Sequence, residues 1–478
     1  MPIHSLARSS AISEGVDPRR VLDFLDAVQT AGLELHSLMV VRHGSVVAEG
    51  WWEPYCADRR HLMYSVSKTF TGAAVGLALA EGLVSLDSPV ISFFPAQAPD
   101  PVDPRVAALT VHHLLSMSTG HDEDVLPRMQ AGADRDSVRT FLSTPPQTPV
   151  GSRHVYNNGA TNVLGAIVRA VTNQSLMDYL RPRLFDPLGI SEPTWATDRE
   201  GAELGWSGLH ITTESLAALG ELYLRDGVWR GCRLLPEGWV AASAQAQVGT
   251  GDRDSIDSTL GYGYQMWVSR HGFRADGAFG QFGLVLPDQD AVVAITAGTQ
   301  QSQEILDQVW THLLPAFSAA TLAPDPAAER ALTDRLARLS MQSPPHERSQ
   351  ITTWRATGPV PVAPGNDDGA WYPSLSDPEL TRTAEGWSLT FLENGQRITI
   401  VCGDGVRVGS VLRHPTGRGV PVAASVSTSA DRAAVDIVFV ETPHRLRLDL
   451  VATADQTTAL MGWNVPPLHH ATLADLSA

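Results

Sequence analysis

A serine and a lysine stand three positions apart in the segment Tyr64-Ser65-Val66-Ser67-Lys68-Thr69. A serine hydroxyl is a weak nucleophile until a neighbouring group removes its proton. A desolvated lysine can do this, because burial lowers its pKa toward neutrality. Lys68 is the only lysine of the chain, and an arginine could not replace it as a base because a guanidinium group stays protonated. The pair therefore indicates a serine nucleophile with a lysine base, and a chance pairing is the plainer alternative.

The residues that follow this pair predict a central helix. From Ser65 to Gly82 the sequence is rich in Ala, Gly, Leu and Val and has almost no polar face, and a helix that is apolar all round is a buried one. Ser65 begins this predicted helix, and Lys68 lies one turn further along on the same face. A serine in that place can also cap the helix, which is compatible with catalysis.

Two further segments carry residue types that suit the same chemistry. In Val155-Tyr156-Asn157-Asn158-Gly159, the tyrosine can relay a proton and Asn158 can hold the lysine or a substrate amide. In Arg274-Ala275-Asp276-Gly277-Ala278-Phe279-Gly280-Gln281, small residues let a substrate backbone approach a strand closely. Taken singly, the first segment is more typical of a surface loop and the second of a bulge or hairpin turn.

Taken together and in this order, the three segments resemble those of the serine β-lactamase and penicillin-binding-protein superfamily. The similarity is to the branch of class C β-lactamases, family VIII esterases and D-amino-acid peptidases. Ser65-Val66-Ser67-Lys68 matches Ser-x-x-Lys, Tyr156-Asn157-Asn158 matches Tyr-x-Asn, and Ala275-Asp276-Gly277 falls where the family has Lys-Thr-Gly or His-x-Gly. The resemblance covers about residues 15–316, and it includes two further phrases, 113–120 and 187–190.

The resemblance implies a role for each matched residue. Ser65 would be the acylated nucleophile, Lys68 and Tyr156 would share the general base and acid roles, and Asn158 would position Lys68 or a substrate carbonyl. The family's oxyanion hole uses backbone N–H groups, here those of Ser65 and Ala278, and such a donor is commonly worth about 3 kcal/mol in the transition state. Substrate-binding positions by the same resemblance are Asp276, Gly277, Ala278 and Gln281.

The third segment departs from the family pattern. The Lys or His that the family uses to hold a substrate carboxylate is absent, and Asp276 stands in the middle position. A carboxylate there would repel an anionic substrate and attract an amine, although Arg274 can neutralise it. We therefore expect hydrolysis of an ester or amide rather than efficient β-lactamase or carboxypeptidase activity.

Serine hydrolysis through an acyl-enzyme at Ser65 is thus the expected function, on a small-molecule or peptide ester or amide. The alternatives are an acyltransferase, transesterase or peptide cyclase of secondary metabolism that uses the same acyl-enzyme, and a relative that only binds. No cofactor or metal is expected, since the three cysteines are scattered and no metal-ligand spacing occurs. Gly205-Trp206-Ser207-Gly208-Leu209 narrowly misses the nucleophile elbow of α/β-hydrolases. His121-Asp122-Glu123-Asp124 is interpreted as a solvated loop, or else as the border of the active-site mouth.

Bulk composition narrows the function classes. The chain has 478 residues with 18% charged and 43% hydrophobic residues, which is typical of a globular protein. Its formal net charge of -17 argues against a nucleic-acid or membrane partner. The N-terminus shows no signal-peptide pattern, so the expected location is cytoplasmic. A homodimer is left open.

The order of elements predicts an α+β fold. Strands, then helices, then strands and a closing helix are typical of an antiparallel sheet flanked by helices with a helical subdomain, here residues 1–317. Residues 318–364 are rich in Ala and Pro and are predicted to be a linker. Short alternating strands then predict a C-terminal all-β barrel or sandwich over residues 365–478. It resembles the lipocalin-like domain of some family members, which could cover the active site or mediate dimerisation.

Overall fold

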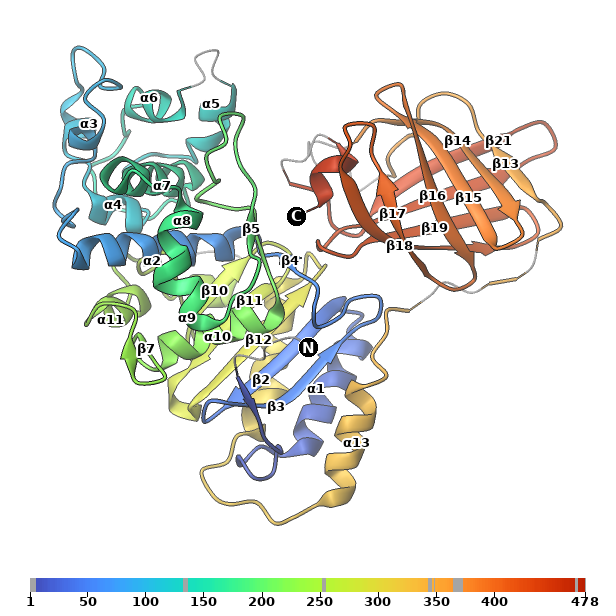
Figure 1. The fold of residues 1–478 in the computed structure, drawn as a ribbon, viewed down its shortest axis with the longest axis horizontal. Coiled ribbons are helices and arrows are strands. Elements are labelled where there is room, and N and C mark those ends of the chain that lie inside the picture. Colours follow the sequence, from blue (N-terminus) through green and yellow to red (C-terminus); the bar gives the residue numbers. More distant parts are fainter. Residues whose placement is uncertain are drawn as a thin grey trace.

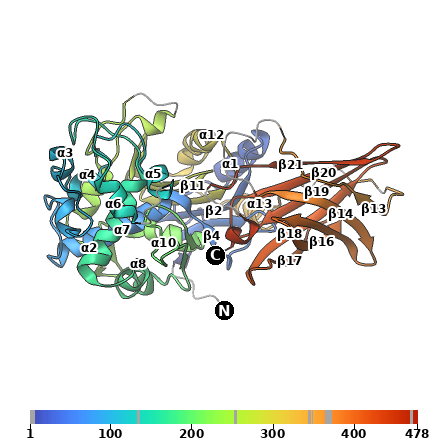
Figure 2. The same cartoon turned by 90° about the horizontal axis from the view of Figure 1, so that it is seen from above.

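The computed structural model describes residues 6–131, 136–251, 255–342, 346–347, 349–363, 373–468 and 472–477. An N-terminal domain of helices around a sheet and a C-terminal domain of strands lie side by side along the long axis of the molecule (Figures 1 and 2). The predicted fold class, a β-lactamase-like antiparallel sheet with a helical subdomain and a C-terminal all-β domain, is confirmed.

In the described residues, the N-terminal sheet has seven strands in the order β1-β3-β2-β12-β11-β10-β9. Their bounds are β1 (Ala7–Arg8), β2 (Leu35–Arg42), β3 (Ser45–Trp51), β9 (Trp267–Ser269), β10 (Gly272–Gly277), β11 (Gln281–Leu286) and β12 (Ala291–Ala297). Strand β1 runs parallel to β3, and the other pairings are antiparallel. Strand β2, from the start of the chain, and β12, from the end of the domain, therefore lie next to each other near the centre of the sheet.

Helices cover both faces of this sheet, so its central strands are apolar on both sides. In β2, Leu38 and Val40 pack on one face with α1 (Pro18–Thr30) and α12 (Ser302–Gln308). The alternate residues of that strand pack on the other face with α2 (Ser67–Ala80) and α10 (Thr213–Leu224). Successive side chains of a strand point to opposite faces, so a strand between two helical layers is buried throughout. This places the buried helix α2 directly behind the sheet.

The helical subdomain is built from the chain between β4 (His61–Leu62) and β9. Besides α2 and α10, its helices are α3 (Pro104–Ala107), α4 (Val111–Leu115), α5 (Leu126–Ala131), α6 (Ser137–Leu142), α7 (Asn158–Thr172), α8 (Leu176–Leu180), α9 (Asp186–Leu188) and α11 (Trp239–Ala244). The short strand β6 (Leu209–Ile211) pairs with β4 on one side and with β5 (Thr194–Trp195) on the other, and β7 (Val228–Trp229) pairs with β8 (Cys232–Arg233).

The predicted linker carries structure of its own. Helix α13 (Pro326–Leu336) packs on the N-terminal domain, where Leu332 joins the same apolar cluster as α1. Strand β13 (Thr353–Arg355) pairs with β14 and so belongs to the C-terminal sheet. The predicted boundary at residue 364 lies outside the described residues. The exact domain limits therefore stay a prediction.

The C-terminal domain is a nearly closed β barrel. In the described part of the chain its order is β13-β14-β15-β16-β18-β19-β20-β21, and β17 pairs with β18. A bridge between Val362 and Met461 brings the segment after β13 to β21 and so nearly closes the ring. The bounds are β14 (Leu375–Thr383), β15 (Gly386–Glu393), β16 (Gln396–Asp404), β17 (Val408–Arg413), β18 (Gly419–Thr428), β19 (Arg432–Phe439), β20 (Arg445–Ala452) and β21 (Thr457–Trp463).

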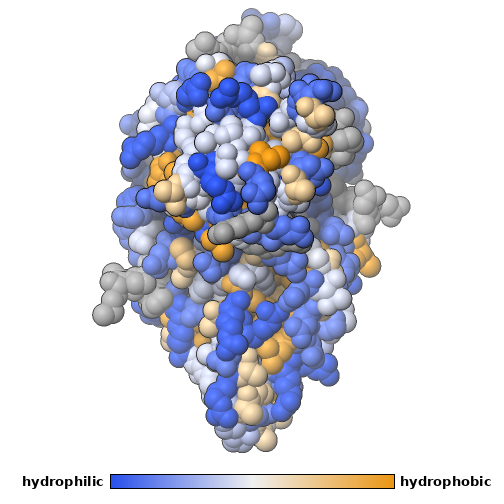
Figure 3. Space-filling view, turned by 90° about the vertical axis from the view of Figure 1, so that its right-hand side faces the viewer, coloured by the Kyte–Doolittle hydropathy of each residue, from blue (hydrophilic) through white to orange (hydrophobic). Residues whose placement is uncertain are grey.

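Hydrophilic residues cover most of the face that the C-terminal domain turns outward, with hydrophobic residues in small scattered patches (Figure 3). None of the helices in the described residues is both long and apolar enough to cross a membrane.

Candidate active site

The predicted nucleophile lies in a tight turn that leads into α2. Residues Tyr64–Val66 form a short 3₁₀ turn, and Ser65 is partly exposed between the buried Tyr64 and Val66. The hydroxyl of Ser67 donates to the Tyr64 carbonyl at 2.6 Å and accepts from the Leu209 N–H at 3.0 Å. The turn is thus held from within and from β6, and it leaves Ser65 partly exposed.

The lysine of the pair is buried against this hydroxyl. Lys68 is 1% exposed, and its Nζ lies 2.8 Å from Ser65 Oγ. Burial lowers the pKa of Lys68 to about 7, although the nearby carboxylates of Asp124 and Asp276 act to raise it. The amine also donates to the Trp206 carbonyl at 2.8 Å, which can only accept. In its neutral form, Lys68 can therefore turn a lone pair toward Ser65 near neutral pH.

The structure brings Tyr156 to the same place. Its ring centroid lies 4.9 Å from Lys68 Nζ, and the ring stacks on Trp267 at 5.8 Å. The segment is held by Asn157, which caps α7 by accepting the Ala160 N–H at 3.2 Å. The helix cap fixes the backbone directly after Tyr156.

Asn158 is positioned by Asp124, which lies in the acidic loop of residues 121–124. Its Nδ2 donates to Asp124 Oδ2 at 2.7 Å, and the other oxygen of Asp124 accepts the Gly159 N–H at 3.2 Å. Asp124 also raises the pKa of Lys68, so its charge is felt at the Ser–Lys pair. Of the two interpretations of the 121–124 loop, the border of the site therefore fits Asp124. The sequence signal was weak, because an acidic loop usually faces water.

The third predicted segment runs along the nucleophile turn. A methyl group added at Gly277 would lie 2.3 Å from the Met63 carbonyl oxygen, so the end of β10 approaches this turn more closely than any side chain would allow. Ala278 follows directly and is partly buried against Tyr64. Gln281 is fully buried, and its Nε2 donates to the Ala278 carbonyl at 3.0 Å. Gln281 thus holds the segment after β10 rather than lying open to a substrate.

Asp276 forms an ion pair on the site side of β10. Its Oδ2 accepts from Arg274 Nε at 2.8 Å, and the guanidinium of Arg274 lies 5.7 Å from the centroid of the Trp267 ring. Burial raises the pKa of Asp276, while the charge of Arg274 opposes this. The side chain of Asp276 is 24% exposed. The negative charge of Asp276 therefore acts on Lys68, and Arg274 partly neutralises that charge.

Nothing in the described residues forms a cluster of three or more His, Cys, Asp or Glu side chains suited to a metal ion. Ser65 contacts the amine of Lys68, and Tyr156 and the carboxylates of Asp124 and Asp276 act on that amine in turn, while Asn158 binds Asp124. This set can transfer protons to and from a serine hydroxyl.

The model of the family described as Beta-lactamase matches residues 24–316, which include all of these groups. The chain belongs to the β-lactamase family. The match ends before β13, so it covers the N-terminal domain only. The resemblance found in the motifs is confirmed at the level of the family.

A hydrolase and a penicillin-binding protein are among the curated relatives of this chain. The 6-aminohexanoate-dimer hydrolase of Paenarthrobacter ureafaciens is 27% identical over 43% of this chain and 55% of its own length. Penicillin-binding protein 4 of Amycolatopsis lactamdurans is 28% identical over 52% of this chain and 75% of its own length. The chain thus spans about half to three quarters of these relatives.

Among solved structures, that of SurE is similar with a TM-score of 0.50 and 18% sequence identity. The similarity covers 86% of this chain and 94% of that one, which is more than the family match spans. A likeness at this identity shows the fold, and here it includes part of the C-terminal β domain.

Proposed function

We propose that this chain is a serine hydrolase that forms an acyl-enzyme at Ser65 and cleaves a carboxylic ester or amide of a small molecule or peptide. The observation that carries the proposal is the 2.8 Å contact between Lys68 Nζ and Ser65 Oγ, together with burial that lowers the pKa of Lys68 to about 7. A base with a pKa near the working pH combines a useful neutral fraction with adequate proton affinity. A protein that only binds has no need for such an arrangement.

Acylation would begin when neutral Lys68 takes the proton of Ser65 as Oγ attacks the substrate carbonyl. The carbonyl oxygen becomes an oxyanion, and the N–H groups of Ser65 and Ala278 are the proposed donors to it. The close approach of Gly277 to Met63 supports this, because it brings the two backbone segments side by side. When the intermediate collapses, the leaving alcohol or amine takes a proton, for which Tyr156 beside Lys68 is the proposed route.

Deacylation reverses these roles with water as the acceptor. Lys68 would take a proton from the attacking water, and the Ser65 oxygen would recover a proton as the acid is released. An amine or alcohol in place of water gives acyl transfer through the same steps. Adding an amine acceptor to the assay and analysing the product distinguishes the two outcomes.

The charges at the site favour neutral or amine-bearing substrates. Asp124 and Asp276 both act on Lys68, and Arg274 is 1% exposed and already paired with Asp276. A substrate carboxylate would therefore meet negative charge without the cation that the family pattern places in the third motif. A substrate amine would meet carboxylates that can accept from it.

The test is hydrolysis of a panel of p-nitrophenyl esters, amino-acid amides and a chromogenic β-lactam by three proteins. The wild type is expected to turn over at least one neutral ester or amide, and Ser65→Ala is expected to be inactive. Ser207→Ala is the matched control, because Ser207 belongs to the near-miss elbow segment and is expected to keep the activity. Activity that survives in Ser65→Ala and disappears in Ser207→Ala would move the nucleophile to the other serine.

A further inference from the structure

The two N–H groups of the proposed oxyanion hole each lie next to a residue in the left-handed region. Tyr64, directly before Ser65, has a φ of 46°, and Phe279, directly after Ala278, has a φ of 69°. Residues with a side chain rarely adopt this conformation, because Cβ then crowds the following carbonyl oxygen. Such residues persist where the surrounding structure holds them, and they cluster at functional sites. The contacts of these two rings therefore help to hold the backbone conformation next to Ser65 and Ala278.

A third ring, from the C-terminal domain, packs on both of them. The centroid of His444 lies 5.9 Å from that of Tyr64 and 5.8 Å from that of Phe279, and the latter two lie 5.5 Å apart. All three contacts are edge-to-face, which is a favourable arrangement for rings. His444 is fully buried, and Val465 and Leu468 of the same domain join the cluster.

A buried hydrogen bond connects His444 to the nucleophile turn. His444 Nδ1 lies 3.0 Å from the Val465 carbonyl oxygen, which can only accept, so Nδ1 carries the hydrogen. In the neutral ring Nε2 is then an acceptor, and it receives the Tyr64 hydroxyl at 2.6 Å. The same hydroxyl accepts the Leu468 N–H at 3.4 Å. Both of these partners of the Tyr64 hydroxyl belong to the C-terminal domain.

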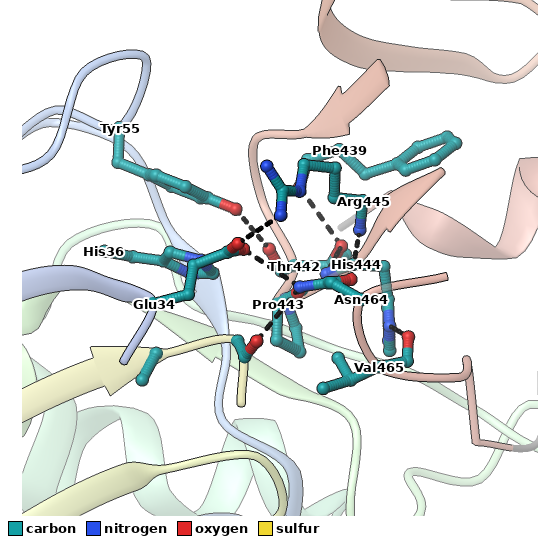
Figure 4. A network of polar contacts seen from close by, with 12 residues as sticks. Glu34, His36, Tyr55, Phe439, Thr442, Pro443, His444, Arg445, Asn464 and Val465 are labelled. Atoms are coloured by element: carbon teal, nitrogen blue, oxygen red, sulfur yellow. Dashed lines mark hydrogen bonds and ion pairs between the residues drawn. The ribbon is translucent and has the colours of Figure 1, made fainter. Parts of the chain in front are cut away.

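The C-terminal segment that carries this histidine is anchored on both sides of it (Figure 4). On one side, the Tyr55 hydroxyl of the N-terminal domain donates to the Thr442 carbonyl at 3.0 Å. On the other, Arg445 forms an ion pair with Glu34 at 2.7 Å, and Asn464 donates to the same carboxylate at 2.9 Å. The imidazole of His444 is therefore held in place and can restrict the rings of Tyr64 and Phe279.

We propose that His444 is a positioning residue of the acylation centre. Through the Tyr64 hydroxyl and the rings of Tyr64 and Phe279, it holds the backbone next to the N–H donors of Ser65 and Ala278. The C-terminal domain is thereby part of the active centre. The inference rests on the proposed function, because it concerns the rate at which Ser65 is acylated.

The test compares two tyrosine hydroxyls that both bond across the domain interface. Tyr64→Phe keeps the ring and removes the bond to His444, and Tyr55→Phe removes an equally buried bond to the same C-terminal segment. The rate constant of acylation and KM are measured with a p-nitrophenyl ester, on enzyme whose active sites have been titrated. We expect Tyr64→Phe to lower the acylation rate constant about 10- to 100-fold with little change in KM. Tyr55→Phe is expected to stay close to the wild-type value.

His444 itself is tested with two variants. His444→Phe keeps an aromatic ring but accepts no hydrogen bond, and its loss of rate is expected to equal that of Tyr64→Phe. The double variant is expected to lose no more than either single one, because both remove the same interaction. His444→Gln, whose amide oxygen can accept from Tyr64, is expected to regain part of the rate. If His444→Phe does not fold, Tyr64→Phe and His444→Gln still decide the matter.

Wild-type acylation rates in Tyr64→Phe and His444→Phe would overturn the proposal. Equal losses in Tyr55→Phe and Tyr64→Phe would also overturn it, because they would show a general requirement for domain docking. A wild-type protein that is not acylated at Ser65 would contradict the proposed function itself, and this is read from the wild type before any variant is compared.

Discussion

The chemistry of the proposed site depends on the protonation state of Lys68. Burial lowers its pKa to about 7, and only the neutral amine can take the proton of Ser65. The neutral fraction grows as the pH rises through that value. We therefore expect kcat/KM for a neutral ester to rise with pH to a plateau, with a midpoint near pH 7. A pH–rate profile in buffers of constant ionic strength measures it, and a profile flat from pH 5.5 to 8.5 would contradict a lysine base.

A charge-conserving substitution separates the charge of Lys68 from its basicity. Lys68→Arg keeps a cation but removes the group that can lose a proton, so it is expected to be almost as inactive as Lys68→Ala. Loss of a general base typically costs about 10²- to 10⁴-fold in rate. Steady-state kinetics of the two variants check this. An arginine variant that keeps most of the wild-type activity would show that the lysine acts only as a charge.

The carboxylate of Asp276 is expected to disfavour anionic substrates. Asp276→Asn is expected to improve kcat/KM for an anionic substrate relative to its neutral ester analogue. Two charges a few Å apart interact by about 1–4 kcal/mol, depending on the dielectric, and the ion pair with Arg274 at 2.8 Å places the effect at the lower end. Added salt should reduce it, since the carboxyl group is partly exposed. Unchanged selectivity in the variant would remove Asp276 from substrate choice.

At the scale of elements, the position of β10 beside the nucleophile turn depends on Gly277. An added methyl group would lie 2.3 Å from the Met63 carbonyl oxygen, so Gly277→Ala must push the strand and the turn apart. We expect the acylation rate to fall about 100-fold, as for a displacement of about 1 Å at a reacting centre. Gly409→Ala in β17, where nothing lies within 4 Å, is the matched control. Equal rates in the two variants would show that this close approach has no part in acylation.

The motifs on helices were predictable because their signals are local. The Ser–Lys spacing and the apolar run after it predicted a helix from Ser65 to Gly82, and α2 lies within that range. The Trp206 carbonyl that holds Lys68 was not predictable, because every residue has a carbonyl group.

At the scale of the whole molecule, the contact between domains had no signal in the sequence. Tyr64 and His444 are 380 positions apart, and neither has neighbours that mark a partner. The all-β C-terminal part of the fold was predicted from the change of pattern, because alternating strands with turn residues differ from helical spacing. Periodicity thus predicts what an element is, while long-range contacts come only from the folded chain.

The segment that connects the two domains is expected to be the part of the chain most accessible to a protease. We expect limited proteolysis to cut first between residues 319 and 364, and outside the docked helix α13, because exposed backbone is cut most readily. A broad-specificity protease followed by mass spectrometry locates the cut. The fragments are expected to stay together on gel filtration, since the Glu34–Arg445 ion pair and its neighbours remain. First cuts between residues 65 and 180 would contradict the division into domains.

Covalent acylation of Ser65 can be detected directly by mass. A fluorophosphonate probe is added to the wild type and to Ser65→Ala, and intact-mass spectrometry with peptide mapping locates the adduct. We expect one adduct per chain, on the peptide that contains Ser65, and no adduct in the variant. Labelling that persists unchanged in Ser65→Ala would contradict it.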